Sequence, residues 1–170
     1  MRRLVMRRLV AALAGTVLTW GIAASPAVAA APERYTDHFE ETDTIDCSEF
    51  DPAWTFNDDF VDVFDIRGQV WLNDAGQPVR ALEHIVHRST DVNSITGLTL
   101  HEHNHFSVQI DFIGGTVTVN GAINIMQRPG VGSVILNAGH KVFDSETGLP
   151  LVLKGPDRAD DEDFCRALAP

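Results

Sequence analysis

The sequence predicts an all-β fold, an antiparallel up-and-down meander that closes into a small barrel, with a two-sheet β-sandwich as the alternative. Three observations support this fold class. From residue 58 onward, apolar and polar residues alternate with a period of two. Short turns containing glycine separate the alternating segments at regular intervals. The segments between these turns lack the 3.6-residue period of a helix. Closing the meander would remove exposed strand edges, which favours the barrel.

The first 29 residues have the layout of a secretory signal peptide. A basic start with four arginines precedes an apolar run over residues 9–24, and the small-residue string Ala27-Val28-Ala29 follows. The apolar run is short for a membrane span and is diluted by glycine and threonine. We therefore expect cleavage near Ala29, a secreted or extracellular protein, and no membrane span after cleavage.

The charge balance excludes some classes of partner. The chain has 24 acidic and 13 basic residues, and cleavage would remove four arginines, so 9 basic residues would remain and the net charge would be −15. A protein this acidic cannot assemble a large basic patch, which argues against binding to nucleic acid or to anionic lipid.

The chain after the signal peptide divides into three parts. Residues 30–57 are polar and acidic and predict an extended or flexible lead-in. Residues 58–155 predict the β-barrel domain. Its expected strands cover about 60–72, 79–90, 98–112, 116–126, 133–143 and 149–154. Residues 156–170 predict an acidic tail with one helical turn, because acidic residues favour the start of a helix.

The two cysteines, Cys47 and Cys165, lie near the two ends of the predicted mature chain. An even, distant pair in an exported protein predicts one disulfide bond, which would tie the acidic tail back to the domain. On the chain-entropy model, such a bond would contribute roughly 4–5 kcal/mol to stability.

Three histidines at every second position mark the predicted strand 98–112: His101, His103 and His105. They share one strand face with Thr99, Ser107, Gln109 and Asp111. The opposite face holds Leu98, Leu100, Phe106, Val108, Ile110 and Phe112 and is interrupted by Glu102 and Asn104. Since the apolar face must point to the core, we expect the histidines on the solvent side. A bulge at Glu102 to Asn104 would turn part of the row inward.

This region faintly resembles the first cupin motif, G-x5-H-x-H-x3-E. Gly97 stands six residues before His103, His105 completes the H-x-H, and Gln109 occupies the place of the glutamate. The resemblance implies a transition metal with His103, His105, Gln109 and His140 as ligands. Together with the neighbouring His101, the candidate metal-binding histidines are His101, His103, His105 and His140.

His84 and His87 lie on the predicted strand 79–90 with opposite parity, so a flat strand cannot aim both at one place. We expect them to be cross-strand partners of the strand 98–112. Together with His101 to His105, they could form a pH-responsive patch.

Several short motifs are distributed along nearly the whole mature chain, each at one position. They are an early Cys, the D-x-x-G-x-P-like turn at residues 74–78, N-S-x-T-G at 93–97, a His-Phe-aliphatic strand, Pro129-Gly130-Val131-Gly132, V-F-D-x-x-T-G at 142–148, and a final Cys. In this arrangement the chain resembles a family of small exported proteins of unassigned function that are numerous in actinobacteria. The resemblance implies secretion and a β-rich fold, and it carries no catalytic motif.

We expect a non-enzymatic binding protein. Its ligand would be a small apolar molecule inside a lipocalin-like barrel, or another component of the cell envelope. The expected lining of the barrel is Phe60, Phe64, Leu100, Phe106 and Ile110. One alternative is a metal-dependent, cupin-like enzyme that uses His103 and His105. Another is a structural or interaction protein without a pocket. The sequence leaves the oligomeric state open.

Overall fold

The computed structural model describes residues 31–128 and 130–170, so the predicted signal peptide lies outside the described residues. The strands are β1 (Glu33–Asp46), β2 (Asn57–Leu72), β3 (Pro78–Asn93), β4 (Thr99–Asp111), β5 (Thr116–Arg128), β6 (Gly132–Asp144), β7 (Pro150–Lys154) and β8 (Asp157–Arg158). A short 3₁₀ helix η1 (Cys47–Glu49) follows β1, and the helix α2 (Asp161–Leu168) ends the fold. Within the described residues, no helix has the length and apolar character needed to cross a membrane.

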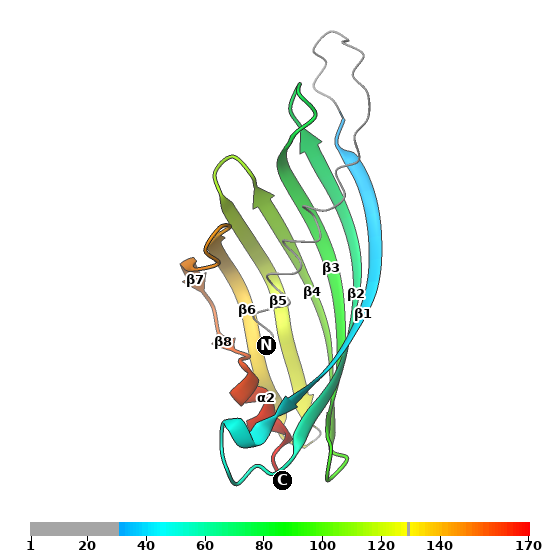
Figure 1. The fold of residues 1–170 in the computed structure, drawn as a ribbon, viewed down its shortest axis with the longest axis vertical. Helices are drawn as coiled ribbons and strands as arrows, with labels where there is room; N and C mark the ends of the chain where they lie inside the picture. The colour runs from blue at the N-terminus through cyan, green and yellow to red at the C-terminus, as the bar shows by residue number, and fades with distance from the viewer. Residues whose placement is uncertain (1–30, 129) are drawn as a thin grey trace.

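The strands form one antiparallel, eight-stranded sheet (Figure 1). Each strand from β1 to β6 pairs with the next one along the chain, and β8 pairs with β6. The predicted all-β, antiparallel, up-and-down order is therefore confirmed. In the described part of the chain, β1 and β7 are not hydrogen-bonded to each other, so the sheet is open and does not close into the predicted barrel.

The sheet begins earlier than the predicted domain boundary at residue 58. Residues 33–46, predicted as a lead-in, form the edge strand β1. This strand pairs with β2 along its whole length, from Glu33 opposite Val70 to Asp46 opposite Asn57. The acidic segment that follows the predicted cleavage site is therefore part of the sheet.

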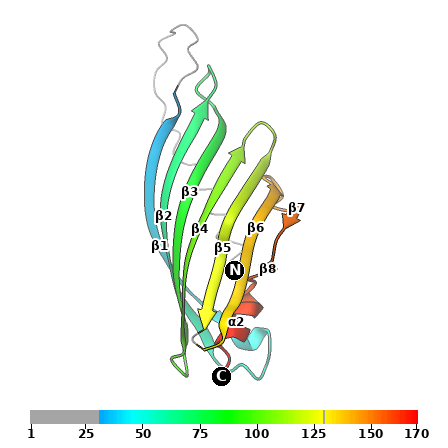
Figure 2. The ribbon, with the colours of Figure 1, turned by 180° about the vertical axis from the view of Figure 1, so that it is seen from behind.

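The two faces of the sheet differ in burial. We call the face that carries the buried residues of β2, β3 and β4 the inner face, and the opposite one the outer face. On the inner face, the largest apolar cluster packs against α2 at one end of the sheet. It contains Ile45, Phe60, Leu100, Met126, Ile135, Phe164 and Leu168. Two smaller clusters continue along the same face. Figure 2 shows the sheet from behind.

A disulfide bond joins η1 to α2, between Cys47 and Cys165, as predicted. Figure 1 shows η1 beside α2 at the end of the sheet. The tail contains two turns of helix where one was expected. The side chain of Asp160 accepts a hydrogen bond from the Asp163 backbone N–H and caps the helix start. Asn93 on β3 donates to the Leu168 carbonyl at 3.1 Å, which fixes the end of the helix to the sheet.

Candidate functional site

The inner face contains an unusual number of buried polar side chains. They are Asp58, Asp62, Glu83, His87, Ser89, Asp91, Asn93, Glu102, Asn104 and Lys141. Burying charged groups is costly unless they are paired or hold a metal, so a concentration of them indicates a functional site or an ionic network.

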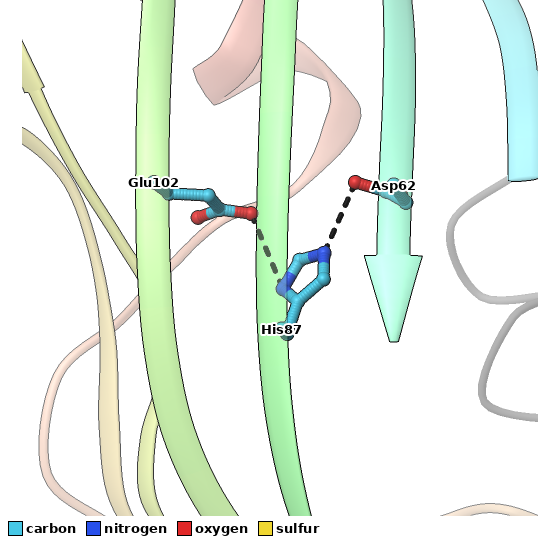
Figure 3. A group of neighbouring side chains, drawn as sticks. All are labelled: Asp62, His87 and Glu102. Atoms are coloured by element: carbon cyan, nitrogen blue, oxygen red, sulfur yellow. Dashed lines mark hydrogen bonds and ion pairs between the residues drawn. The ribbon is translucent and has the colours of Figure 1, made fainter. Parts of the chain in front are cut away.

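Three of these residues converge on neighbouring strands of the inner face: Asp62 on β2, His87 on β3 and Glu102 on β4 (Figure 3). Asp62 Oδ1 lies 3.0 Å from His87 Nε2, and Glu102 Oε1 lies 3.4 Å from His87 Nδ1. One ligand atom from each residue lies within 4.8 Å of the others. All three side chains are at least 95% buried.

The pairing register explains why these residues meet. Ser89 on β3 stands opposite both Asp62 on β2 and Glu102 on β4, and His87 lies two residues away on the same face. Residues opposite each other in antiparallel strands project to the same side. The alternation of β2, β3 and β4 therefore places an imidazole between two carboxylates.

The plane of the His87 ring is fixed by aromatic stacking. The ring lies on Phe64 with a centroid distance of 4.4 Å and an interplanar angle of 10°. Phe64 in turn stacks on Phe39 of β1 at 4.7 Å. This stack spans three strands and holds both imidazole nitrogens toward the carboxylates.

A register shift in the β4–β5 pairing completes the surroundings. Glu102 pairs with Met126 and Phe106 pairs with Gly121, so β5 has one residue more than β4 in this interval. Asn104 Oδ1 accepts a hydrogen bond from the Ile125 backbone N–H at 2.8 Å, where the ladder is interrupted. Asn104 Nδ2 then faces His87 Nδ1 at 3.4 Å.

An irregularity is therefore present at Glu102 to Asn104, where a bulge was the condition for turning the histidines inward, but the extra residue lies in β5. It does not turn the histidine row inward. Asn124, within the shifted part of β5, donates from Nδ2 to Glu102 Oε1 at 3.2 Å and holds this carboxylate beside the imidazole.

A second inner-face contact lies nearer the other end of the sheet. Tyr35 on β1 donates a hydrogen bond from its hydroxyl to Glu83 on β3 across the intervening strand β2. Burial raises the pKa of the Glu83 carboxyl, and the hydrogen bond from Tyr35 opposes this shift. Burial, followed by the contact with Glu83, also raises the pKa of Tyr35.

The histidines predicted as metal ligands lie on the outer face. His101, His103 and His105 are exposed, which confirms their predicted orientation. The rings of His103 and His105 are 4.8 Å apart, and His101 Nδ1 lies 3.1 Å from the Thr90 hydroxyl.

The fourth predicted ligand, His140, is on β6, two strands away from β4. It stands opposite Asn120, which stands opposite Ser107. Gln109 accepts a hydrogen bond from Arg80 at 3.0 Å. His103, His105 and Gln109 lie on β4, and His140 lies on β6. Within the described residues, the group of side chains close enough to hold one ion does not include these histidines, so the four-ligand arrangement that the cupin resemblance implied is not formed.

The residues predicted to line an apolar pocket lie on the inner face but in different places. Phe60 and Leu100 belong to the cluster at α2, Phe64 to a second cluster, and Ile110 to a third. Phe106 borders one surface hollow and Phe60 another. The structure thus does not gather these five side chains around one pocket.

Sequence reasoning missed Asp62 and placed His87 in a pH-responsive patch with His84 and His101 to His105. The structure buries His87 on the inner face, whereas these other histidines are exposed on the outer face. The signal that could have found the site is the interruption of an apolar strand face. Asp62 interrupts the alternation between Phe60 and Phe64, just as Glu102 and Asn104 interrupt that of the strand 98–112. One polar residue on an inward face is common, but three adjacent strands with such an interruption mark a shared site.

Comparison of the chain with protein-family models, with curated proteins and with solved structures gives no match.

Proposed function

We propose that this chain is an exported binding protein and that its ligand is a divalent transition-metal ion held by Asp62, His87 and Glu102. The observation that carries the proposal is the convergence of one imidazole and two carboxylates, all buried, within 4.8 Å. Imidazole nitrogen and carboxylate oxygen bind ions such as Zn²⁺ or Mn²⁺ at about 2.0–2.2 Å. Two ligands of one ion then lie about 3–4 Å apart, so ligand atoms that are 4.8 Å apart must approach each other by about 1–2 Å to hold the ion.

The surroundings of His87 support metal binding. A metal-binding histidine usually has its second ring nitrogen held by a carboxylate or a similar group, which fixes the ring for the ion. Here Nε2 faces Asp62 and Nδ1 faces Glu102 and Asn104, so the nitrogen that does not bind the ion keeps a polar neighbour. The stack on Phe64 further restrains the ring.

The same residues argue against an apolar ligand at this place. Asp62, His87, Glu102 and Asn104 interrupt the apolar surface of the inner face between its clusters. An apolar molecule would offer these polar groups neither a hydrogen bond nor a charge, so this part of the inner face does not favour an apolar ligand. A binding role is retained from the sequence analysis, with a different class of ligand.

Export is supported by the disulfide and by the resemblance to small exported actinobacterial proteins. Disulfide bonds form and persist mainly in oxidising compartments such as the cell exterior. The bond between Cys47 and Cys165 joins residues 118 positions apart, so it fixes the fold as a whole.

The proposal is tested by titrating Zn²⁺ and Mn²⁺ into the oxidised, chelator-treated protein in a calorimeter. We expect one ion per chain. Asp62→Asn and Glu102→Gln should each weaken binding by at least about tenfold, because each removes a charged oxygen ligand while keeping the side-chain shape. His84→Ala is the matched control, since His84 lies on the same strand and is exposed on the outer face.

A wild-type protein that binds neither ion would overturn the proposal and identify the three residues as an ionic network of the core. Equal affinity of wild type and both carboxylate variants would also overturn it. Thermal unfolding adds an independent reading, because an ion at 100 times its Kd stabilises the folded state by about 2.7 kcal/mol. Metal-dependent stabilisation should be present in His84→Ala and reduced in Glu102→Gln.

A further inference from the structure

The outer face carries one row of residues that runs across the strands. We define the transverse row as Thr36, Arg67, His84, Ser107, Asn120, His140 and Lys154, one residue from each of β1 to β7. Each member is the direct pairing partner of the next. Since neighbouring strands are about 4.8 Å apart, the row is about 29 Å long. We propose that this row binds a linear, phosphate-bearing chain, and that binding strengthens as the pH falls.

The composition of the transverse row is unlike that of the whole chain. Acidic residues outnumber basic ones by 24 to 13 in the sequence, yet the row contains no carboxylate. Arg67 and Lys154 are cationic, His84 and His140 become cationic on acidification, and the remaining three members offer neutral hydrogen-bonding groups. Ser107 and His140 are partly buried and the other five are exposed.

An open hollow lies over the first five members of the row. It has a volume of about 1030 Å³, and Thr36, Arg67, His84, Ser107 and Asn120 all line it. The ligand would therefore lie in a depression of the sheet, along the direction in which the donors follow one another.

The rest of the hollow is also rich in cationic groups. His38, Arg88 and His105 line it, with Asp37 and Asp65 as its carboxylates. Asp65 already has two partners. It accepts a hydrogen bond from His38 Nδ1 at 2.7 Å and another from the Arg88 guanidinium. These two bonds, first that from His38, lower the pKa of Asp65. Arg67 and Arg88 therefore balance the two carboxylates of the hollow, and protonation of its histidines would make it positive within an acidic protein.

At the far end of the row, the backbones of β6 and β7 approach each other closely. Gly139 on β6 has φ +120°, and a Cβ there would lie 2.1 Å from the Lys154 carbonyl oxygen. Only glycine permits this approach, which places Lys154 beside His140. His140 Nδ1 and Asn120 Oδ1 are 2.7 Å apart, so the imidazole is oriented by its neighbour on β5.

The donors of the row match phosphate oxygens. Arginine binds phosphate through paired N–H groups, lysine binds it as a point charge, and hydroxyl and amide groups add hydrogen bonds. A row of about 29 Å exceeds the size of one phosphate ion, which indicates a chain of several phosphates. The row contains no Phe, Tyr or Trp ring, the large aromatic side chains on which nucleic-acid bases usually stack. The proposed ligand is therefore a phosphate chain without bases.

Two imidazoles make the binding pH-dependent. When His140 Nδ1–H donates to Asn120, Nε2 becomes a donor only in the protonated ring. The charged groups facing His84 are Arg67 and Asp65 on β2 and His105 on β4, with Arg88 on its own strand. Lys154 on β7 faces His140, and its β5 neighbour is uncharged. Protonation of either imidazole therefore adds positive charge to the row.

The test measures binding of fluorescently labelled linear polyphosphate to the oxidised protein at about pH 5.5 and about pH 7.5, by anisotropy. We expect at least about fivefold tighter binding at the lower pH. Arg67→Gln and His84→Gln should each weaken binding at the lower pH by about three- to tenfold, since each removes a charge-assisted hydrogen bond. Both side chains are exposed, so the fold should tolerate these changes.

His101→Gln is the matched control, because His101 is exposed on the same face and lies outside the row. An equal loss in His101→Gln and His84→Gln would overturn the proposal in favour of unspecific histidine charge. Absence of binding at both pH values, or equally tight binding of orthophosphate, would also overturn it. Equally tight binding of single-stranded DNA would reject the stated class of ligand.

Discussion

Gly68 has no side chain, and the ring of a neighbouring residue, Tyr35, occupies the space that a side chain would fill. It lies on β2 between Tyr35 on β1 and Glu83 on β3, in one row of the inner face. The Tyr35 ring covers it, and a Cβ at this position would lie 2.2 Å from Tyr35 Cζ. A glycine within a strand is often covered by a neighbouring aromatic ring in this way.

The substitution Gly68→Ala should displace the Tyr35 ring and break its hydrogen bond to Glu83. We expect the free energy of unfolding to fall by about 1–3 kcal/mol, the usual cost of overpacking. Urea denaturation measures this loss. Tyr35→Phe supplies the control, because its cost should be small once Gly68→Ala has already moved the ring. Fully additive costs in the double variant would contradict this explanation.

Glu83 should make stability depend on pH in a defined direction. Burial raises its pKa above the ordinary value of 4.5. The folded state then holds the proton more tightly than the unfolded state, so stability is fully present below about pH 4.5 and falls as the pH rises through the folded pKa. We expect Glu83→Gln to be more stable than wild type at neutral pH, with a difference that shrinks toward pH 4.5.

Thermal unfolding of both proteins across this pH range measures the effect. Glutamine keeps an oxygen that can accept the hydrogen bond from Tyr35, so the variant removes mainly the charge. A constant difference between the two proteins at all pH values would show that Glu83 titrates normally.

Individual side chains were predictable from the sequence where strand parity alone decides their place. The orientation of His101, His103 and His105 follows from the alternation of a single strand. The meeting of Asp62, His87 and Glu102 depends on the relative register of three strands. Turn geometry and pairing set this register, and neither is visible in a single segment.

At the scale of elements, the disulfide fixes α2 to the sheet. On the chain-entropy model, the bond between Cys47 and Cys165 stabilises the fold by about 4–5 kcal/mol, because it closes a long loop in the unfolded chain. The double variant Cys47→Ser/Cys165→Ser should lose up to this amount in denaturant unfolding. The burial of Phe164 and Leu168 should keep part of α2 in place.

Far-ultraviolet circular dichroism of the double variant checks that the sheet persists. A loss below about 1 kcal/mol would show that packing of α2, and not loop closure, dominates this end of the fold. Reduction of the wild-type protein is the matched control, since it opens the same loop without changing any residue.

The strands from β3 to β7 could be predicted within a few residues because their apolar alternation is regular and glycine-containing turns separate them. The edge strand β1 could not. Its apolar inner-face residues are Tyr35, Phe39 and Ile45, and the inner positions between them hold Asp37, Glu41 and Asp43. Acidic residues at these positions hide the period of two, and pairing with β2 forms the strand.

At the scale of the whole molecule, the barrel was expected because closure removes exposed edges. The described structure has two edges, β1 and β7. The acidic residues of β1 repel a second copy of the same edge, and β7 is only five residues long. Charged and short edge strands are established ways to prevent edge pairing, so the sheet has no need to close. Curvature and closure are properties of the full sheet that alternation within one strand does not determine.

The histidines of the chain are divided between the faces of the sheet. His87 is on the inner face, whereas His38, His84, His101, His103, His105 and His140 are on the outer face. Acidification should therefore affect the two proposed sites in opposite ways. Protons compete with a metal for His87, and they add charge for a phosphate chain on the other side.

The order of strand pairing also determines how the chain can fold. Because every strand from β1 to β7 pairs with its neighbour in sequence, each hairpin can form by closing a short loop. Proteins dominated by such local contacts fold faster than β proteins with distant pairings. The contacts of α2 are exceptions, and the disulfide between α2 and η1 joins residues 118 positions apart. An oxidised chain begins refolding with this distant contact already formed. The loop closure that costs the most conformational entropy is then complete before the first hairpin forms.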